Sequence, residues 1–217
     1  MARLRKAARL WRDPEKRAMA MRVLVPEKGP LYEDGPLYAI DPAHLFGRRA
    51  PLEVELGAGR GDFIMDYAAN RPERDFLAVE LAASVARVLA IRAARHGLCN
   101  LRVARMDART LINLMLPAQS LSACHVYFPD PWLTLSQQKH RMFSPGFARR
   151  LRRVLAPEAI VHVATDVEPY AVEMFAMLEG AGFRQVEIAA PGAHASGFGR
   201  KYLAQGKPVF SASFAME

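Results

Sequence analysis

Pro51-Leu-Glu-Val-Glu-Leu-Gly-Ala-Gly-Arg-Gly61 is the stretch of sequence that decides the fold of this chain. Residues 51–56 predict a strand, and the glycines that follow predict a tight turn whose backbone adopts positive φ and approaches a ligand closely. Residues 62–70 then predict a helix. A strand, a glycine turn and a helix in this order are typical of the first unit of a doubly wound α/β sheet, in which ligands bind beyond the carboxyl ends of the strands.

Strands and helices alternate along the rest of the chain. Helices are expected at 84–96, 145–154 and 168–180, and strands at 75–80, 100–105, 121–128, 159–164, 183–189 and 207–214. The segment 121–128 is almost continuously apolar, as buried parallel strands are. This alternation predicts a Rossmann-like α/β fold with a doubly wound, mostly parallel sheet of about seven strands.

The chain of 217 residues fits a single α/β domain with an N-terminal extension. We expect residues 1–48 to be a basic arm followed by a connector rich in Pro and Gly, and residues 49–217 to be the domain. Two interpretations of the basic arm stay open. It is either a solvated terminal segment or an arm that grips an RNA backbone.

The composition favours a polyanionic partner and argues against several other classes of protein. The formal net charge is +8, and Lys and Arg side chains that neutralise phosphates release counterions. No apolar run approaches the roughly 18 residues that span a bilayer, so we expect no membrane segment and a cytoplasmic location. The two cysteines, Cys99 and Cys124, lack zinc-binding spacing, so we expect no metal site.

Acidic residues lie at three successive predicted strand ends, at Glu55, Glu80 and Asp107. Because the carboxyl ends of parallel strands meet at one edge of a sheet, these carboxylates are expected to converge on one cleft. Glu55 would repel a pyrophosphate and attract a cation, Glu80 is placed to accept from both ribose hydroxyls, and Asp107 from an adenine amino group. The pattern favours a positively charged nucleoside such as S-adenosylmethionine. The alternative is that these acids cap the helices that follow.

The loop Tyr127-Phe-Pro-Asp-Pro-Trp132 follows the fourth predicted strand. Its prolines stiffen the backbone and place Asp130 and Trp132 over the expected cleft. An acid flanked by aromatic rings at this position indicates a flat base as substrate, although Asp-Pro turns are also common without any function. His125 and His162 fall inside predicted strands, and we expect both to be core histidines with satisfied hydrogen bonds.

Six segments together match the pattern of a known family. They are Val54-Glu-Leu-Gly-Ala-Gly-Arg-Gly61, Phe76-Leu-Ala-Val-Glu80, Asn100-Leu-Arg-Val, Asp107-Ala108, Phe128-Pro-Asp-Pro-Trp132 and Ala164-Thr-Asp-Val-Glu-Pro-Tyr-Ala171. Through them the chain resembles the bacterial tRNA (guanine-N7)-methyltransferases, which have the class I methyltransferase fold, from about residue 52 to about residue 183.

The resemblance implies S-adenosylmethionine as cofactor and tRNA as substrate. It implies that the acids matching Glu55, Glu80 and Asp107 contact the cofactor, beside the turn of Gly57, Gly59 and Gly61. It also implies that the acid matching Asp130 lies at the catalytic centre, and that the acid matching Asp166 contacts the guanine.

Two segments depart from the family pattern. Thr134 stands where the family has a substrate-contacting Lys, and only Lys139, His140 and Arg141 keep the run after Trp132 basic. Near the C-terminus, Ser196-Gly-Phe-Gly199 stands where the family has Thr-x-Phe/Tyr-Glu. We assign substrate binding to Asp166 and to the residues at or next to these segments, which are Trp132, Thr134, Ser196 and Phe198.

Three functions follow from these patterns. The first is methylation of N7 of a guanine in a tRNA loop, because a loop base is unstacked and accessible. The second is methyl transfer to another base or amine, since Asp-Pro-x-Trp is similar to the Asn/Asp-Pro-Pro-aromatic loop of amino-group methyltransferases. The third is an RNA-binding protein that keeps the fold. The sequence leaves both a monomer and a homodimer open.

Overall fold

The computed structural model describes residues 23–24 and 40–217 of the chain. The two interpretations of the basic arm, and most of the proposed connector, therefore lie outside the described residues. The boundary between residues 48 and 49 stays a prediction.

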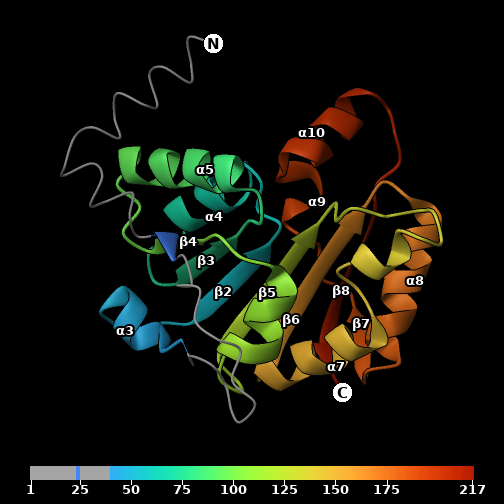
Figure 1. Ribbon diagram of the computed structural model, residues 1–217, viewed down its shortest axis with the longest axis horizontal. Helices are drawn as coiled ribbons and strands as arrows, with labels where there is room; N and C mark the ends of the chain where they lie inside the picture. Colours follow the sequence, from blue (N-terminus) through green and yellow to red (C-terminus); the bar gives the residue numbers. More distant parts are fainter. Residues whose placement is uncertain (1–22, 25–39) are drawn as a thin grey trace.

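The described residues form an eight-stranded sheet at the centre of the molecule (Figure 1). Its strands are β1 (Val23–Leu24), β2 (Leu52–Leu56), β3 (Asp75–Val79), β4 (Leu101–Ala104), β5 (Leu121–Tyr127), β6 (Leu155–Thr165), β7 (Phe183–Val186) and β8 (Phe210–Met216). They lie in the order β1-β4-β3-β2-β5-β6-β8-β7. The pairs from β1 to β6 are parallel, and β8 runs antiparallel to both β6 and β7. The predicted Rossmann-like, mostly parallel sheet is confirmed.

The two halves of the sheet meet between β2 and β5. On one side of β2, the next strands in the sequence, β3 and β4, follow in order. The chain then crosses to the other side of β2, where β5 pairs with it and the second half of the sheet begins. Leu56, at the end of β2, pairs with Val126, one residue before the end of β5. The glycine turn and the Asp130 loop, which lie far apart in the sequence, are therefore neighbours at the switch point, where doubly wound sheets bind ligands.

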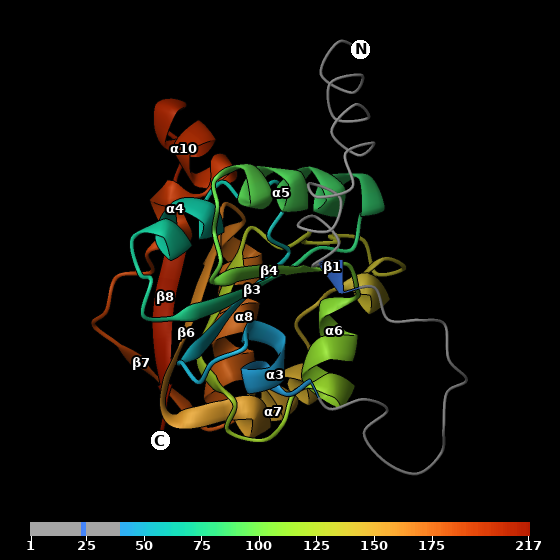
Figure 2. The same ribbon diagram turned by 90° about the vertical axis from the view of Figure 1, so that its left-hand side faces the viewer.

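Helices cover both faces of the sheet. They are α3 (Pro42–Phe46), α4 (Ile64–Ala69), α5 (Ala83–Arg95), α6 (Ala108–Thr110), the π-helical turn η1 (Leu111–Met115), the 3₁₀ turn η2 (Gln138–His140), α7 (Pro145–Val154), α8 (Glu168–Glu179), α9 (Gly192–Ala195) and α10 (Gly197–Ala204). Figure 2 shows α4 and α5 on one side of the sheet and α6, α7 and α8 on the other. No helix in the described part of the chain is both long and apolar enough to cross a bilayer.

The central strands are buried on both faces, and β2 shows how this places acids in the interior. Leu52, Val54 and Leu56 belong to the hydrophobic core that also contains α7 and α8. Because side chains alternate along a strand, Glu53 and Glu55 point to the opposite face, where they are only 2% and 4% exposed. Acids at these positions need partners, because an unpaired buried charge is strongly destabilising.

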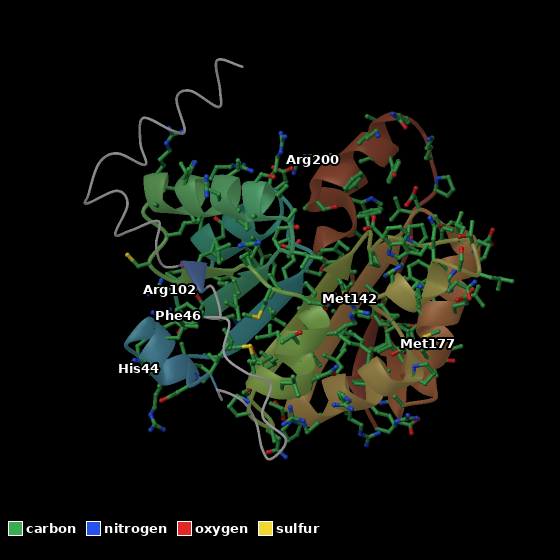
Figure 3. All side chains as sticks on the ribbon, viewed as in Figure 1. His44, Phe46, Arg102, Met142, Met177 and Arg200 are labelled. Carbon is green, nitrogen blue, oxygen red and sulfur yellow. The ribbon has the colours of Figure 1, made fainter. Side chains whose placement is uncertain are left out.

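Several expected elements differ from the structure. The connector before residue 49 was expected to be a loop, which is wrong for α3, because Asp41 caps this short helix by accepting from the amide of Ala43. Phe46 of α3 packs on the core and lies under the guanidinium of Arg102, whose Cζ is 4.9 Å from the ring centroid (Figure 3). Helices α9 and α10 were not expected, and β8 begins three residues later than the predicted strand.

Candidate active site

The glycine turn after β2 is held in a left-handed conformation. The φ angles are 78° at Gly57, 56° at Gly59 and 76° at Gly61. A Cβ on Gly61 would lie 2.1 Å from Cδ1 of Leu89 on α5, whereas a Cβ on Gly57 or Gly59 would meet no atom within 4 Å. The amide of Gly57 donates to the carbonyl of Val79 at 2.9 Å. The turn is thus anchored by β3 and α5 and leaves open space above its first two glycines.

Glu55 lies beneath this turn, and one oxygen of its carboxyl group is unsatisfied. Its Oε2 atom is buried and has no hydrogen-bond partner among the described residues. Burial raises the pKa of Glu55 well above its usual value, and the negative charges of Asp62 and Glu80 act in the same direction, against one backbone hydrogen bond from Ile64. A buried acceptor without a partner costs about 1–3 kcal/mol. Glu55 therefore favours a ligand that brings a hydrogen-bond donor or a positive charge.

Glu80, at the end of β3, fastens the glycine turn. Its Oε2 accepts from the amide of Gly59 at 3.0 Å, and its Oε1 accepts from the amide of Ala82 at 2.7 Å. A carboxylate offers about four acceptor positions. Glu80 therefore keeps capacity to accept hydroxyl groups of a ligand.

Asp107, after β4, caps α6. It accepts from the amide of Arg109 at 2.8 Å, and its Oδ2 lies 2.6 Å from Nη2 of Arg109. The hydrogen bond from the Arg109 side chain lowers the pKa of Asp107 against the opposing effect of burial, with help from the backbone hydrogen bond and the charge of Arg109. Asp107 therefore caps a helix, as one of the two interpretations of the acids expected, and the same side chain also lines the cleft.

The three acids line one continuous cleft made of two cavities. The first cavity, of about 380 Å³, is lined by Glu55 and Ser196. The second, of about 570 Å³, is lined by Glu80, Asp107 and Asp130. Five residues line both cavities and join them: Gly57, Gly59, Tyr127, Phe128 and Phe198. The structure confirms that Glu55, Glu80 and Asp107 converge on one cleft. Their roles toward a ligand stay predictions.

The loop after β5 is strained and firmly fixed. Phe128 has φ 52° and Trp132 has φ 41°, which is unfavourable for a residue with a Cβ. The amide of Phe128 donates to the carbonyl of Ala164 at 2.7 Å, and Nε of Arg141 donates to the carbonyl of Pro131 at 2.7 Å. These bonds hold the exposed Asp130 side chain at the edge of the second cavity, beside Trp132.

Helix α10 forms the opposite side of the cleft. Ser196 is its N-cap, and the Ser196 Oγ accepts from the amide of Gly199 at 3.0 Å. Phe198 is 54% exposed at the junction of the two cavities. Arg200 lies between α10 and α5 in Figure 3, and its Nη1 donates to the carbonyl of Asp62 at 3.5 Å. Ser196 and Phe198 were predicted from the sequence, whereas the helix that carries them was not.

Two predicted substrate residues lie outside the lining of the cleft. Thr134 is exposed, and its hydroxyl donates to Oε1 of Gln137 at 2.7 Å within the same loop. Asp166 directly follows β6 and is half-buried; burial raises the pKa of Tyr202, and the negative charge of Asp166 helps to raise it. The structure therefore brings neither Asp166 nor Thr134 into the lining of the two cavities.

A buried polar chain supports Tyr127, a cleft residue that the sequence analysis missed. The Tyr127 hydroxyl lies 2.9 Å from Nδ1 of His125, whose Nε2 lies 2.8 Å from Oε2 of Glu53. The other oxygen of Glu53 pairs with Arg74 at 2.8 Å. Burial raises the pKa of Glu53, but His125 and Arg74 outweigh it and leave this pKa lowered. The available signal was the alternation along β5, which places His125 and Tyr127 on the same face as Glu53.

The histidine prediction is confirmed for both strands. His125 is fully buried with both ring nitrogens in hydrogen-bond contact, and it stacks on His162 with ring centroids 5.0 Å apart. Nδ1 of His162 lies 2.7 Å from Oγ of Ser213. Burial and the nearby His125 lower the pKa of His162 to about 3, so His162 is a neutral core residue. Within residues 23–24 and 40–217, no three His, Cys, Asp or Glu side chains gather into a group that could hold a metal ion.

The strand order, the glycine turn and the acid-lined cleft at the switch point define a Rossmann-like class I methyltransferase fold. The solved structure of the 16S rRNA methyltransferase KamB superposes with a TM-score of 0.59 at 18% identity, covering 80% of this chain and 91% of KamB. At this identity the likeness shows the fold. Residues 49–212 match a family model described as "Putative methyltransferase", and the chain belongs to this family.

Two relatives share much of the sequence and carry the name tRNA (guanine-N(7)-)-methyltransferase. The protein from Methylococcus capsulatus is 42% identical over 151 residues, which cover 70% of this chain and 65% of that protein. The protein from Myxococcus xanthus is 38% identical over 173 residues, which cover 77% of this chain and 84% of that protein. The chain thus spans less than two thirds of the Methylococcus protein and most of the Myxococcus protein.

Gly199, where the family pattern has Glu, has no room for any side chain. A Cβ there would lie 2.1 Å from the carbonyl oxygen of Ala193 and 2.9 Å from Cα of His194, both backbone atoms of α9. We expect Gly199→Ala to lower the free energy of unfolding by roughly 1–3 kcal/mol, because overpacking outweighs the better helix propensity of Ala. Urea denaturation measures this change.

The matched control for this prediction is Gly146→Ala in α7. A Cβ at Gly146 would lie 3.9 Å from the nearest atom, which is an ordinary contact. We expect this variant to unfold at the same or slightly higher urea concentration than the wild type. Equal stability of the two variants would contradict the close packing of α9 on α10.

Proposed function

We propose that this protein is an S-adenosylmethionine-dependent methyltransferase that methylates N7 of a guanine in a loop of tRNA. The observation that carries the proposal is the convergence of Glu55, Glu80 and Asp107 on one cleft, with Asp130 at its edge. Membership of the methyltransferase family supports the reaction, and the net charge of +8 supports a polyanionic substrate. A tRNA substrate also supports a cytoplasmic location.

The residues of the cleft fit S-adenosylmethionine. The unpaired Oε2 of Glu55 matches a ligand ammonium group, and the spare acceptor positions of Glu80 match two ribose hydroxyls. The open space above Gly57 and Gly59 lets the ligand approach the backbone closely. Asp107 offers an acceptor for the adenine amino group. When bound, the cofactor supplies an electrophilic methyl group on a positively charged sulfur.

The substrate side of the cleft has to hold a flat base with N7 directed inward. Neutral guanine has a free lone pair on N7, so no side chain has to remove a proton from the nucleophile. The aromatic side chains of Phe128, Trp132 and Phe198 offer stacking surfaces, and stacking on an aromatic ring contributes about 1–3 kcal/mol per base. Fixed alignment of this kind can lower the barrier by roughly 7–11 kcal/mol.

Two carboxylates then act on the base. Positive charge develops on the purine as the methyl group is transferred, and the fixed Asp130 carboxylate stabilises this charge. Asp166 accepts from the N1–H and the amino group of guanine, which distinguishes guanine from the other bases. Tyr127, fixed from below by His125, forms the floor of the cleft between the two cavities.

A methyl-transfer assay tests the proposed function. With labelled S-adenosylmethionine and unmodified tRNA transcripts, we expect N7-methylguanine as the labelled nucleoside. Transcripts that carry 7-deazaguanine are the matched control, because they lack the N7 nucleophile and should take up no label. A labelled methylamine would instead indicate a different base or amine substrate, and tRNA binding without transfer would indicate an RNA-binding role.

A further inference from the structure

The junction between the two cavities of the cleft is lined mainly by aromatic rings. Of the five residues that line both cavities, three are aromatic, namely Tyr127, Phe128 and Phe198, and the other two are Gly57 and Gly59. No acidic residue of the described chain lines both cavities. A positive charge held at the junction therefore meets aromatic side chains rather than carboxylates.

S-adenosylmethionine carries a positive charge at the corresponding point of its own structure, because its sulfonium joins the amino-acid half to the nucleoside half. Glu55 lines the first cavity, whereas Glu80 and Asp107 line the second. With the ammonium group at Glu55 and the nucleoside in the second cavity, the sulfur that links the two halves comes to the junction. This step rests on the proposed cofactor-binding roles of the three acids.

Tyr127 is the most firmly fixed of the three aromatic side chains at the junction. It is only 6% exposed, and its hydroxyl lies 2.9 Å from Nδ1 of His125. A Cβ on Gly192 would lie 2.0 Å from Cε2 of Tyr127, so the backbone of α9 packs directly on the ring. The ring of Phe63 meets it edge-on, with centroids 5.0 Å apart. These contacts keep the ring of Tyr127 in one place when the cleft is empty.

The hydrogen bonds behind Tyr127 make its ring a better surface for a cation. Because the carboxylate of Glu53 only accepts, Nε2 of His125 donates to it, which leaves Nδ1 of the neutral imidazole as acceptor for the Tyr127 hydroxyl. A phenol that donates a hydrogen bond gains electron density on its oxygen and its ring. The face of an aromatic ring is already negative, and it attracts cations most strongly where water is excluded.

We propose that the ring of Tyr127 binds the positively charged sulfur of S-adenosylmethionine and so distinguishes the cofactor from its neutral product, S-adenosylhomocysteine. Transfer of the methyl group leaves the bonding electron pair on sulfur, which becomes an uncharged thioether. The attraction between the sulfur and the ring is then lost, while the contacts of the ammonium group, ribose and adenine stay the same. Tyr127 thus favours exchange of the product for a new cofactor.

The test compares the Kd of S-adenosylmethionine and of S-adenosylhomocysteine, each measured by calorimetry, in the wild type and in Tyr127→Leu. We expect the ratio of the product Kd to the cofactor Kd to fall about 5- to 30-fold, which corresponds to roughly 1–2 kcal/mol of lost cation–π attraction. The two ligands differ only in the methyl group and the charge. A general disturbance of the cleft therefore weakens both to the same extent and leaves the ratio unchanged.

A series of rings at position 127 keeps the test valid if Tyr127→Leu fails to fold. Tyr127→Phe retains the ring and should lower the ratio by no more than about threefold. Fluorinated phenylalanines at the same position keep nearly the same shape but draw electrons from the face of the ring. The ratio should fall further with each added fluorine.

Phe175→Leu is the matched control for the loss of an aromatic ring. Phe175 lies on α8 and packs against Phe214, with ring centroids 5.5 Å apart, and it lines neither cavity of the cleft. We expect its ratio of Kd values to stay within about twofold of the wild type, because no cation is bound near this ring.

The possible failures can be told apart. A wild type that does not bind S-adenosylmethionine overturns the proposed cofactor site and this role of Tyr127 with it. If the wild type binds the cofactor, an unchanged ratio in Tyr127→Leu or a ratio that ignores the fluorine content overturns the role of Tyr127 alone. The methyl acceptor enters neither measurement, so a failure to form N7-methylguanine overturns only the proposed substrate.

Discussion

Glu55→Gln is expected to weaken the binding of S-adenosylmethionine by about 10- to 150-fold and at the same time to stabilise the ligand-free protein increasingly as the pH rises above about 5. The reason is the buried Oε2 of Glu55, which has no partner among the described residues. A bound ammonium group satisfies this atom, and a buried hydrogen bond between charged groups contributes about 1.5–3 kcal/mol. A neutral amide cannot make this charged pair. Isothermal titration calorimetry of both proteins measures the loss.

The pH dependence of stability follows from the direction of the Glu55 pKa. In the folded protein the pKa of Glu55 lies well above its usual value of 4.5. Between these two pKa values, the folded protein keeps a proton on Glu55 that the unfolded chain has released. The free energy of unfolding of the wild type therefore falls as the pH rises from about 5 toward the folded pKa, by up to about 1.4 kcal/mol per pH unit. Glu55→Gln has no such proton, so its advantage over the wild type should grow with pH.

Binding of the cofactor should show the opposite trend. A ligand cation beside Glu55 favours the carboxylate, so binding releases a proton, and the affinity of the wild type should rise by up to about tenfold per pH unit in the same window. Asp66→Asn is the matched control, because Asp66 is an exposed acid on α4 away from the cleft. Tight, pH-independent binding by Glu55→Gln would show that Glu55 does not hold the ammonium group.

Asp130→Asn is expected to lower kcat for methyl transfer by about 100- to 1,000-fold, the size of effect seen when one preorganised charge-stabilising group is removed from an active site. Asp130 lies at the edge of the second cavity, on a loop fixed by Pro129, Pro131 and the bond from Arg141. The amide keeps the shape of the side chain and removes the negative charge that faces the purine. Single-turnover kinetics with saturating tRNA measure the chemical step directly.

The control measurement for Asp130→Asn is cofactor binding. Asp130 lies apart from Glu55, which lines the other cavity, so the Kd of S-adenosylmethionine should change less than twofold. An unchanged kcat would remove Asp130 from the reaction, whereas an equal loss of cofactor affinity and rate would place it in the cofactor site.

Much of the cofactor side was predictable because it depends on local patterns. Strand ends in a parallel sheet meet at one edge, so acids placed directly after predicted strands had to come together. Glu80 and Asp107 illustrate how far this argument goes, since both line the cleft and both also cap backbone amides. Cofactor contact and helix capping were posed as alternatives for the acids, and the structure shows that one carboxylate can both cap a backbone amide and line the cleft.

The substrate side was harder to predict because its local pattern is misleading. Gly197 and Gly199 are poor helix formers, so the segment 192–204 gave no helical signal, yet α10 forms. Gly199 is required there because α9 packs against it. Thr134 was assigned from its place in a motif, but it lines neither cavity, and its hydroxyl donates to Gln137 of the same loop.

The sequence alone determined the doubly wound sheet, the glycine turn and the row of acids at its edge, because each depends on a repeat of hydrophobic residues or on the intrinsic freedom of glycine. Tertiary structure alone decided the raised pKa of Glu55 and the buried contact of His125 with Glu53, which lie 72 residues apart in the sequence. Burial depends on everything packed around a group, and where a side chain points depends on how its loop or helix is packed. Neither quantity is encoded in a local pattern of residues.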